Sequence, residues 1–110
     1  MEEIMQRVEI LENEGIISSR TKECGIDIIK KRYDLYNTSI PFITHFLMSL
    51  ERGYANTQLD DNNISLLTQL KRSNCFDKAY EELLWLENQS HIIWNECERI
   101  YLLMHLIQLF

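Results

Sequence analysis

The sequence is almost free of residues that interrupt helices, and this constrains its fold more than any other feature. It contains one proline and three glycines in 110 residues, and apolar residues recur every three to four positions along most of its length. This spacing is typical of amphipathic helices, whereas the two-residue alternation of strands is almost absent. The sequence therefore predicts an all-α fold, a compact bundle of about five to six helices.

Capping residues and helix breakers indicate where each helix begins and ends. Serines and asparagines suit the first position of a helix, and glycine suits its end. The polar segment at residues 56–63 is predicted to be an exposed loop. The expected helices cover residues 2–14, about 17 residues after Ser18 or Ser19, 39–56, 64–72, 75–88 and 95–110.

Length and charge exclude several classes of protein. A chain of 110 residues has the size of one domain, which we expect to span residues 1–110 and to fold unaided. The formal charge is −6, from 17 acidic and 11 basic residues, and no window gathers the basic residues that a phosphate backbone requires. Direct binding of nucleic acid is not expected.

The distribution of apolar residues argues against a membrane protein. The longest nearly apolar run covers 11 residues, 100–110, whereas a span needs about 20. The acidic start does not resemble a secretory signal, so a cytoplasmic location is expected. Cys24, Cys75 and Cys97 are odd in number and lack CxxC spacing, which indicates reduced structural thiols.

Two helices each carry a histidine off their main apolar stripe. At 100° per residue, the core arc of the helix at 39–56 contains Ile43, Leu47, Leu50 and Tyr54, and His45, Ser49 and Arg52 are predicted to face away from it. In the last helix, the core arc contains Ile100, Leu103, Met104 and Ile107. Glu98 and His105 lie on its far side, two turns apart.

Such histidines have several possible roles. An imidazole can titrate near neutral pH, bind a metal, act as a base, accept a phosphoryl group or simply lie at the surface. Beside His105, Leu102, Leu106 and Leu109 form a second apolar patch that suits another helix, another domain or a second copy of the chain. His91, in a polar junction, is predicted to be a loop or capping residue.

The residues around both histidines resemble one known family. "HFLMSLER", with Arg52 seven residues after His45, is similar to the first signature of the PTS regulation domain, the histidine-bearing module of bacterial regulators controlled by the sugar phosphotransferase system. "ERIYLLMH", with Glu98 seven residues before His105, is similar to the second signature. The segment between them also resembles the family, with Phe76 and Ala79 in place. The resemblance covers about residues 18–110, and the N-terminal helix, residues 1–17, lies outside it.

The resemblance implies a non-enzymatic regulatory domain, often dimeric, that acts in transcriptional or metabolic regulation. His45 and His105 are then the candidate phosphorylation sites, and the phosphocarrier HPr or an EIIB component is the donor. Arg52 is expected to support the site, and Glu98 to orient His105 through a hydrogen bond. The added charge would change dimerisation or binding to a regulator protein.

The sequence also departs from the family. Thr44 stands where the family commonly has an aspartate, and no RNA-binding, DNA-binding or transporter-like output domain is expected here. These departures favour an alternative, a helical interaction or dimerisation module that has lost phosphorylation. An enzyme is not expected, because no phosphate loop, HExxH motif or nucleophile elbow is present and the acidic residues are predicted to lie on solvated faces. A metal held by the histidines and Glu98 would need further ligands that the sequence does not supply, so no metal or cofactor is expected.

Overall fold

The computed structural model describes residues 1–60 and 64–110 and confirms the all-α prediction. Within these residues there are seven helices and no strand. The helices are α1 (Glu2–Asn13), α2 (Ser19–Lys31), α3 (Tyr33–Tyr36), α4 (Ile40–Ala55), α5 (Ile64–Lys71), α6 (Phe76–Ser90) and α7 (Glu96–Leu109).

The number of helices exceeds the predicted five to six because the second predicted helix is broken at Arg32. Its backbone leaves helical geometry there, with φ −128° and ψ 31°. The Arg32 guanidinium lies over the Trp85 ring, 3.9 Å from its centroid, and its Nε lies 3.3 Å from a carboxylate oxygen of Glu82. Both partners belong to α6, so the break lies where this chain segment contacts that helix.

The predicted caps are largely confirmed. Ser18, Ser39 and Asn95 each accept a hydrogen bond from a backbone N–H three residues later, at 3.2, 3.2 and 2.9 Å. α4 and α6 end at Asn56 and His91, both in the left-handed region that helix C-caps use. The prediction that His91 is a capping residue is therefore confirmed.

α6 begins at Phe76, one residue after the predicted start at 75. Its N-cap is Cys75, whose N–H donates a hydrogen bond to the Ser73 hydroxyl at 3.1 Å. Of the predicted loop at 56–63, residues 57–60 lie in no helix, and residues 61–63 lie outside the described part of the chain.

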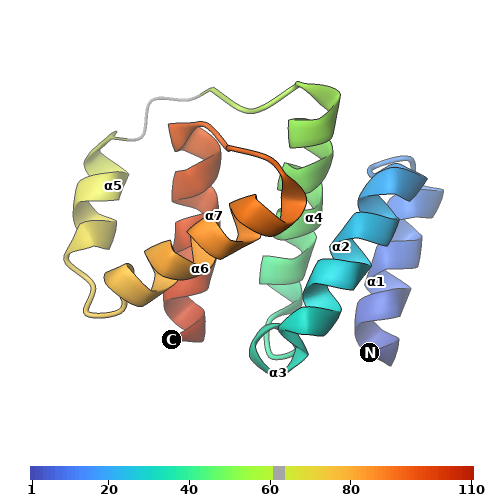
Figure 1. Ribbon diagram of the computed structural model, residues 1–110, viewed down its shortest axis with the longest axis horizontal. Helices are drawn as coiled ribbons and strands as arrows, with labels where there is room; N and C mark the ends of the chain where they lie inside the picture. The colour runs from blue at the N-terminus through green and yellow to red at the C-terminus, as the bar shows by residue number, and fades with distance from the viewer. Residues whose placement is uncertain (61–63) are drawn as a thin grey trace.

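α4 is the central helix of the bundle. It contacts α1, α2, α3 and α7, while α6 crosses over α7 and reaches α2 (Figure 1). Gly25 allows α2 to approach α4 closely, since a Cβ at that position would lie 2.3 Å from a methyl carbon of Leu47. α4 and α7 run side by side in opposite directions, and this pair positions the candidate site.

The core around α4 is aromatic. Tyr36, Phe42, Phe46 and Trp94 form a continuous series of ring contacts, with centroids 4.7, 5.9 and 6.4 Å apart, and all four are buried. Burial of such large side chains supplies much of the stability of a domain this size. The Trp94 indole also donates a hydrogen bond to the Ser49 carbonyl at 3.0 Å, which fixes the start of α7 against α4.

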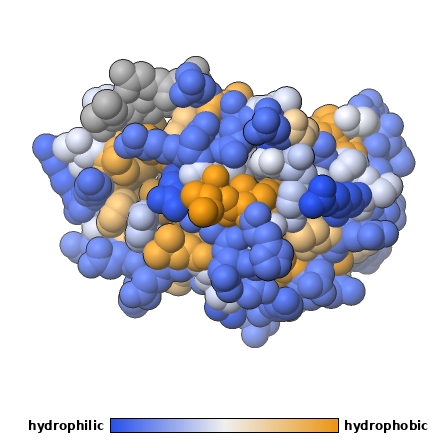
Figure 2. All heavy atoms as spheres, turned by 45° about the horizontal axis from the view of Figure 1, so that its top comes forward, coloured by the Kyte–Doolittle hydropathy of each residue, from blue (hydrophilic) through white to orange (hydrophobic). Residues whose placement is uncertain are grey.

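Apolar side chains also reach the surface. Figure 2 shows apolar patches set among hydrophilic side chains on one face of the molecule. Among the helices described, none is both long enough and apolar enough to cross a bilayer.

Candidate functional site

The four residues singled out in the sequence meet where α4 and α7 pack together, but they pair across the helices. His45 lies beside His105, with ring centroids 4.3 Å apart and ring planes inclined at 32°. Arg52 lies beside Glu98, with N–O distances of 2.6 and 2.8 Å. Because the helices are antiparallel and each separation is seven residues, the histidine pair and the Arg52–Glu98 pair lie about 10 Å apart along the helices.

The Arg52–Glu98 pair is a bidentate, charge-assisted contact. Arg52 donates through Nε and Nη2 to the two carboxylate oxygens of Glu98, which is fully buried. The Ser49 hydroxyl donates to the same carboxylate at 3.3 Å, and the Leu59 N–H donates at 3.1 Å. Four donors therefore compensate one buried charge.

The chain after α4 closes around this carboxylate. Asn95 donates to the Leu59 carbonyl at 2.7 Å, and the Gln58 side chain accepts the Asn95 N–H at 2.7 Å. The segment that follows α4 is thereby tied to the first turn of α7. It delivers the Leu59 N–H to Glu98 and covers the Arg52–Glu98 pair.

Each charge of the Arg52–Glu98 pair stabilises the ionised form of the other residue. Burial alone would raise the pKa of Glu98, but the hydrogen bonds from Arg52 and Leu59 outweigh it and leave the pKa below its ordinary value of 4.5. The hydrogen bonds that Arg52 donates to Glu98 raise the pKa of Arg52. The pair stays ionised at neutral pH, and its stabilisation is lost as pH falls below about 4.5.

This geometry corrects two predictions. Glu98 does not hydrogen-bond His105, because its carboxylate is turned toward Arg52, Ser49 and Leu59. The strip of His45, Ser49 and Arg52 does not face away from the core as a whole. Ser49 is buried and Arg52 half-buried because α7 packs over them, and only His45 is exposed.

The histidine pair is open by comparison. His45 is exposed and His105 half-buried, and no hydrogen bond between described residues engages either imidazole. Burial, together with the positive charge of His45 when protonated, lowers the pKa of His105 below 6.5. At neutral pH the His105 imidazole is therefore mainly neutral and retains a nitrogen lone pair.

A hollow of about 420 Å³ adjoins His45 between α1 and the start of α4. Glu3 and Arg7 line it from α1, and Thr44 and His45 line it from α4. The Thr44 hydroxyl oxygen is buried, and no described residue hydrogen-bonds it. The hollow thus brings a second arginine, from outside the region of family resemblance, to the surroundings of His45.

The structure overturns the prediction that the acidic residues lie only on solvated faces. Glu82, Glu87 and Glu98 are buried, and each pairs with an arginine of another helix or its cap. Glu87 pairs with Arg99 at 2.6 Å and also accepts the Trp94 N–H at 2.9 Å. The sequence signal was present, since these glutamates interrupt apolar stripes, but spacing alone does not show which arginine lies opposite.

The prediction of a second apolar patch for a partner, beside His105, is also wrong. Leu102 and Leu106 are fully buried within the chain itself, because α7 is covered by α4, α5 and α6, and Leu109 is half-buried. These leucines do not form a free face for a partner. The three cysteines carry free thiols, with Cys97 buried. Among the described residues, no group of three or more potential metal ligands comes together.

Comparison with known proteins adds no relative. No family model, curated protein or solved structure matches the chain.

Proposed function

We propose that the chain is a non-enzymatic regulatory domain of the bacterial sugar phosphotransferase type, controlled by phosphorylation of His45 or His105. The observation that carries the proposal is the histidine pair, in which imidazoles from two helices lie 4.3 Å apart, hydrogen-bonded to no described residue. The Arg52–Glu98 pair lies about 10 Å away along the same helices. Phosphorylation then alters binding to a second copy or to a regulator protein in transcriptional or metabolic control.

The chemistry requires a neutral imidazole. An imidazole lone pair attacks the phosphorus of a phosphohistidine on HPr, or of the phosphorylated EIIB component. A new P–N bond forms while the bond to the donor breaks, and the donor group keeps the electron pair of that bond. The lowered pKa of His105 favours this form at neutral pH. Transfer from these carriers would take place in the cytoplasm.

The product adds close to two negative charges at the surface of α4 and α7. Arg52 is already neutralised by Glu98, so it supports the site by fixing the two helices, and it does not supply a free positive charge. Arg7, in the hollow beside His45, is better placed to compensate a phosphoryl group on that residue. Because the rings lie so close, like-charge repulsion favours one phosphoryl group at a time.

The test is phosphotransfer with purified protein. The chain is incubated with phosphoenolpyruvate, enzyme I, HPr and candidate EIIB components, and phosphohistidine is mapped by mass spectrometry under neutral conditions. Label is expected on His45 or His105 and should be lost in the His45→Ala, His105→Ala double variant but retained in His91→Asn. Label confined to His91, or none with carriers that phosphorylate a control acceptor, would refute the proposal.

A second candidate is a helical interaction or dimerisation module that has lost phosphorylation. It is favoured by Thr44, which stands where the resemblance predicts an aspartate and whose buried hydroxyl hydrogen-bonds no described residue. On this proposal, His45→Ala and His105→Ala leave the oligomeric state and partner binding unchanged. Sedimentation velocity of wild type and variants decides between the two, since assembly that depends on histidine phosphorylation excludes the second candidate.

A further inference from the structure

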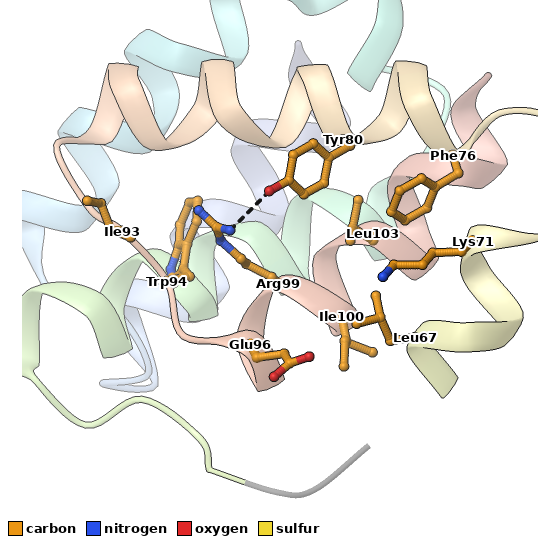
Figure 3. Close-up of a pocket in the computed structure, with 10 residues that line it drawn as sticks. All are labelled: Leu67, Lys71, Phe76, Tyr80, Ile93, Trp94, Glu96, Arg99, Ile100 and Leu103. Atoms are coloured by element: carbon orange, nitrogen blue, oxygen red, sulfur yellow. Dashed lines mark hydrogen bonds between the residues drawn. The ribbon is translucent and has the colours of Figure 1, made fainter. Parts of the chain in front are cut away.

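A larger hollow lies between α5, α6 and α7, apart from the histidine pair (Figure 3). Its volume is about 570 Å³, within the range of roughly 300–1,000 Å³ typical of small-molecule sites. None of its lining residues belongs to the histidine pair or to the Arg52–Glu98 pair. The pocket therefore does not depend on the proposed function.

The walls of the pocket are mostly hydrophobic. Phe76 and Tyr80 lie one turn apart on α6, and their rings are nearly parallel, with centroids 5.8 Å apart. Leu67 from α5 and Ile100 and Leu103 from α7 face the same space (Figure 3). Aromatic faces and branched aliphatic side chains together suit a hydrocarbon chain or a flat ring.

Charged groups at the pocket select the polar end of such a molecule. Arg99 is neutralised by the buried Glu87, at 2.6 and 2.9 Å, and also donates to the Tyr80 hydroxyl at 3.3 Å. Lys71 extends from α5 into the pocket, and it takes part in none of the ion pairs between described residues (Figure 3). Among the described residues that line the pocket, Lys71 is therefore the cation without an ion-pair partner.

The anion that fits is a small one with a single charge. Glu96 also lines the pocket, and its carboxylate repels ligands that carry several negative charges. Arg99 still has two N–H groups outside its described hydrogen bonds, since a guanidinium has five in all. A carboxylate at Lys71 can also accept hydrogen bonds from such donors.

α5 provides a second, independent observation. None of its described side chains is fully buried, and Leu67 is only half-buried although it lines the pocket with residues of α7. A ligand between α5 and the other two helices would cover apolar surface that the chain alone leaves partly wet. Occupancy and the packing of α5 are thus coupled.

We infer that this pocket binds a small amphipathic monocarboxylate, with its hydrocarbon part against Phe76, Tyr80 and the α7 side chains and its carboxylate at Lys71. The test uses 3-phenylpropionate and octanoate as probes, with 3-phenylpropionamide and octanamide as matched neutral controls. Binding is followed by methyl NMR of the whole chain. Shifts are expected at Leu67, Ile100 and Leu103, and the acids should bind at least tenfold more tightly than the amides.

Two variants make the test decisive. Lys71→Gln should remove the preference for acids, while Lys30→Gln, an exposed lysine on α2, should leave it unchanged. Both positions are exposed, so both variants should fold. No shift at the pocket methyls at millimolar probe, or equal binding of acids and amides to the wild type, would overturn the inference.

Discussion

The two ends of the α4–α7 contact differ in how completely their polar groups are satisfied. At Arg52 and Glu98, a buried carboxylate receives four hydrogen bonds and the connecting segment covers it. At His45 and His105, two imidazoles lie against each other, no described residue hydrogen-bonds either one, and His45 is exposed. The same two helices thus hold a buried ion pair and, about 10 Å away, an open pair of imidazoles.

This difference indicates that the Arg52–Glu98 end stabilises the fold, whereas the His45–His105 end is accessible for chemistry. A satisfied, buried ion pair resists rearrangement because removing either partner leaves the other unpaired away from water. The nitrogen atoms of an open imidazole pair can hydrogen-bond water, bind a proton or accept a phosphoryl group. Each sequence motif contains one histidine and one charged residue. The antiparallel packing of α4 and α7 places the two charged residues together at one end of the contact, where they stabilise it, and the two histidines together at the other.

The largest effect is expected from Glu98→Gln. The change removes a fully buried charge and leaves Arg52 without its counterion, so the free energy of unfolding should fall by about 3 kcal/mol. Urea denaturation measures it. Glu96→Gln, an exposed residue in the same helical turn, should change the free energy of unfolding by less than about 0.5 kcal/mol. Equal effects of the two variants would show that the Arg52–Glu98 pair is not a structural support.

A smaller loss is expected from Arg52→Lys. Lysine keeps the positive charge but cannot make the two parallel N–H contacts to Glu98, so the cost should be about 1–2 kcal/mol. Urea denaturation at pH 7 measures the cost. Arg7→Lys, an exposed arginine on α1, is the matched control and should be near neutral. An Arg52→Lys variant as stable as wild type would mean that charge alone holds this end of the contact.

The contact between the two histidines should affect the pH dependence of stability and the pKa of His105. The pKa of His105 in the folded protein lies below the unfolded value of about 6.5. The contribution of His105 to the free energy of unfolding is therefore constant above about pH 7 and falls as pH drops through 6.5. In His45→Asn, one of the two causes of the shift is removed. The pKa of His105 should therefore rise, though burial still holds it below its ordinary value.

NMR titration of the His105 ring protons measures this change directly. His91→Asn is the matched control, because Asn also tolerates the left-handed backbone of a helix C-cap. The control should leave the pKa of His105 unchanged. A pKa that does not respond to His45→Asn would mean that the two rings do not interact in solution.

The smallest effect is expected at Thr44. Its buried hydroxyl hydrogen-bonds no described residue, and valine has nearly the same shape without the polar atom. Thr44→Val should therefore be neutral or stabilising by less than about 1 kcal/mol, as thermal or urea unfolding would show. A loss of 2 kcal/mol or more would reveal a hydrogen bond to this hydroxyl, and the histidine end would then be less open than proposed.

Local features were predictable because they depend on neighbouring residues. Ser39 and Asn95 predicted the starts of α4 and α7, and Asn56 lies at the predicted end of α4, since caps satisfy backbone groups within one turn. A seven-residue separation also placed His45 with Arg52, and Glu98 with His105, on common faces. These faces are the ones that meet in the structure.

The partner of each face was not predictable from spacing. The shared helix face predicts a contact of Glu98 with His105, but the antiparallel approach of α4 brings Arg52 to Glu98 instead. The error at Leu102 and Leu106 has a similar cause. α7 is apolar on most of its circumference, so helical periodicity does not indicate which sides other helices cover.

Double-mutant cycles at Glu98 test the central claim most directly. Coupling free energies are measured by urea denaturation for Arg52 with Glu98 and for Glu98 with His105, using glutamine at 52 and 98 and alanine at 105. Cross-helix pairing predicts a coupling of about 2 kcal/mol or more for Arg52 with Glu98 and less than about 0.5 kcal/mol for Glu98 with His105. The reverse order would mean that each motif acts within its own helix and would contradict the account.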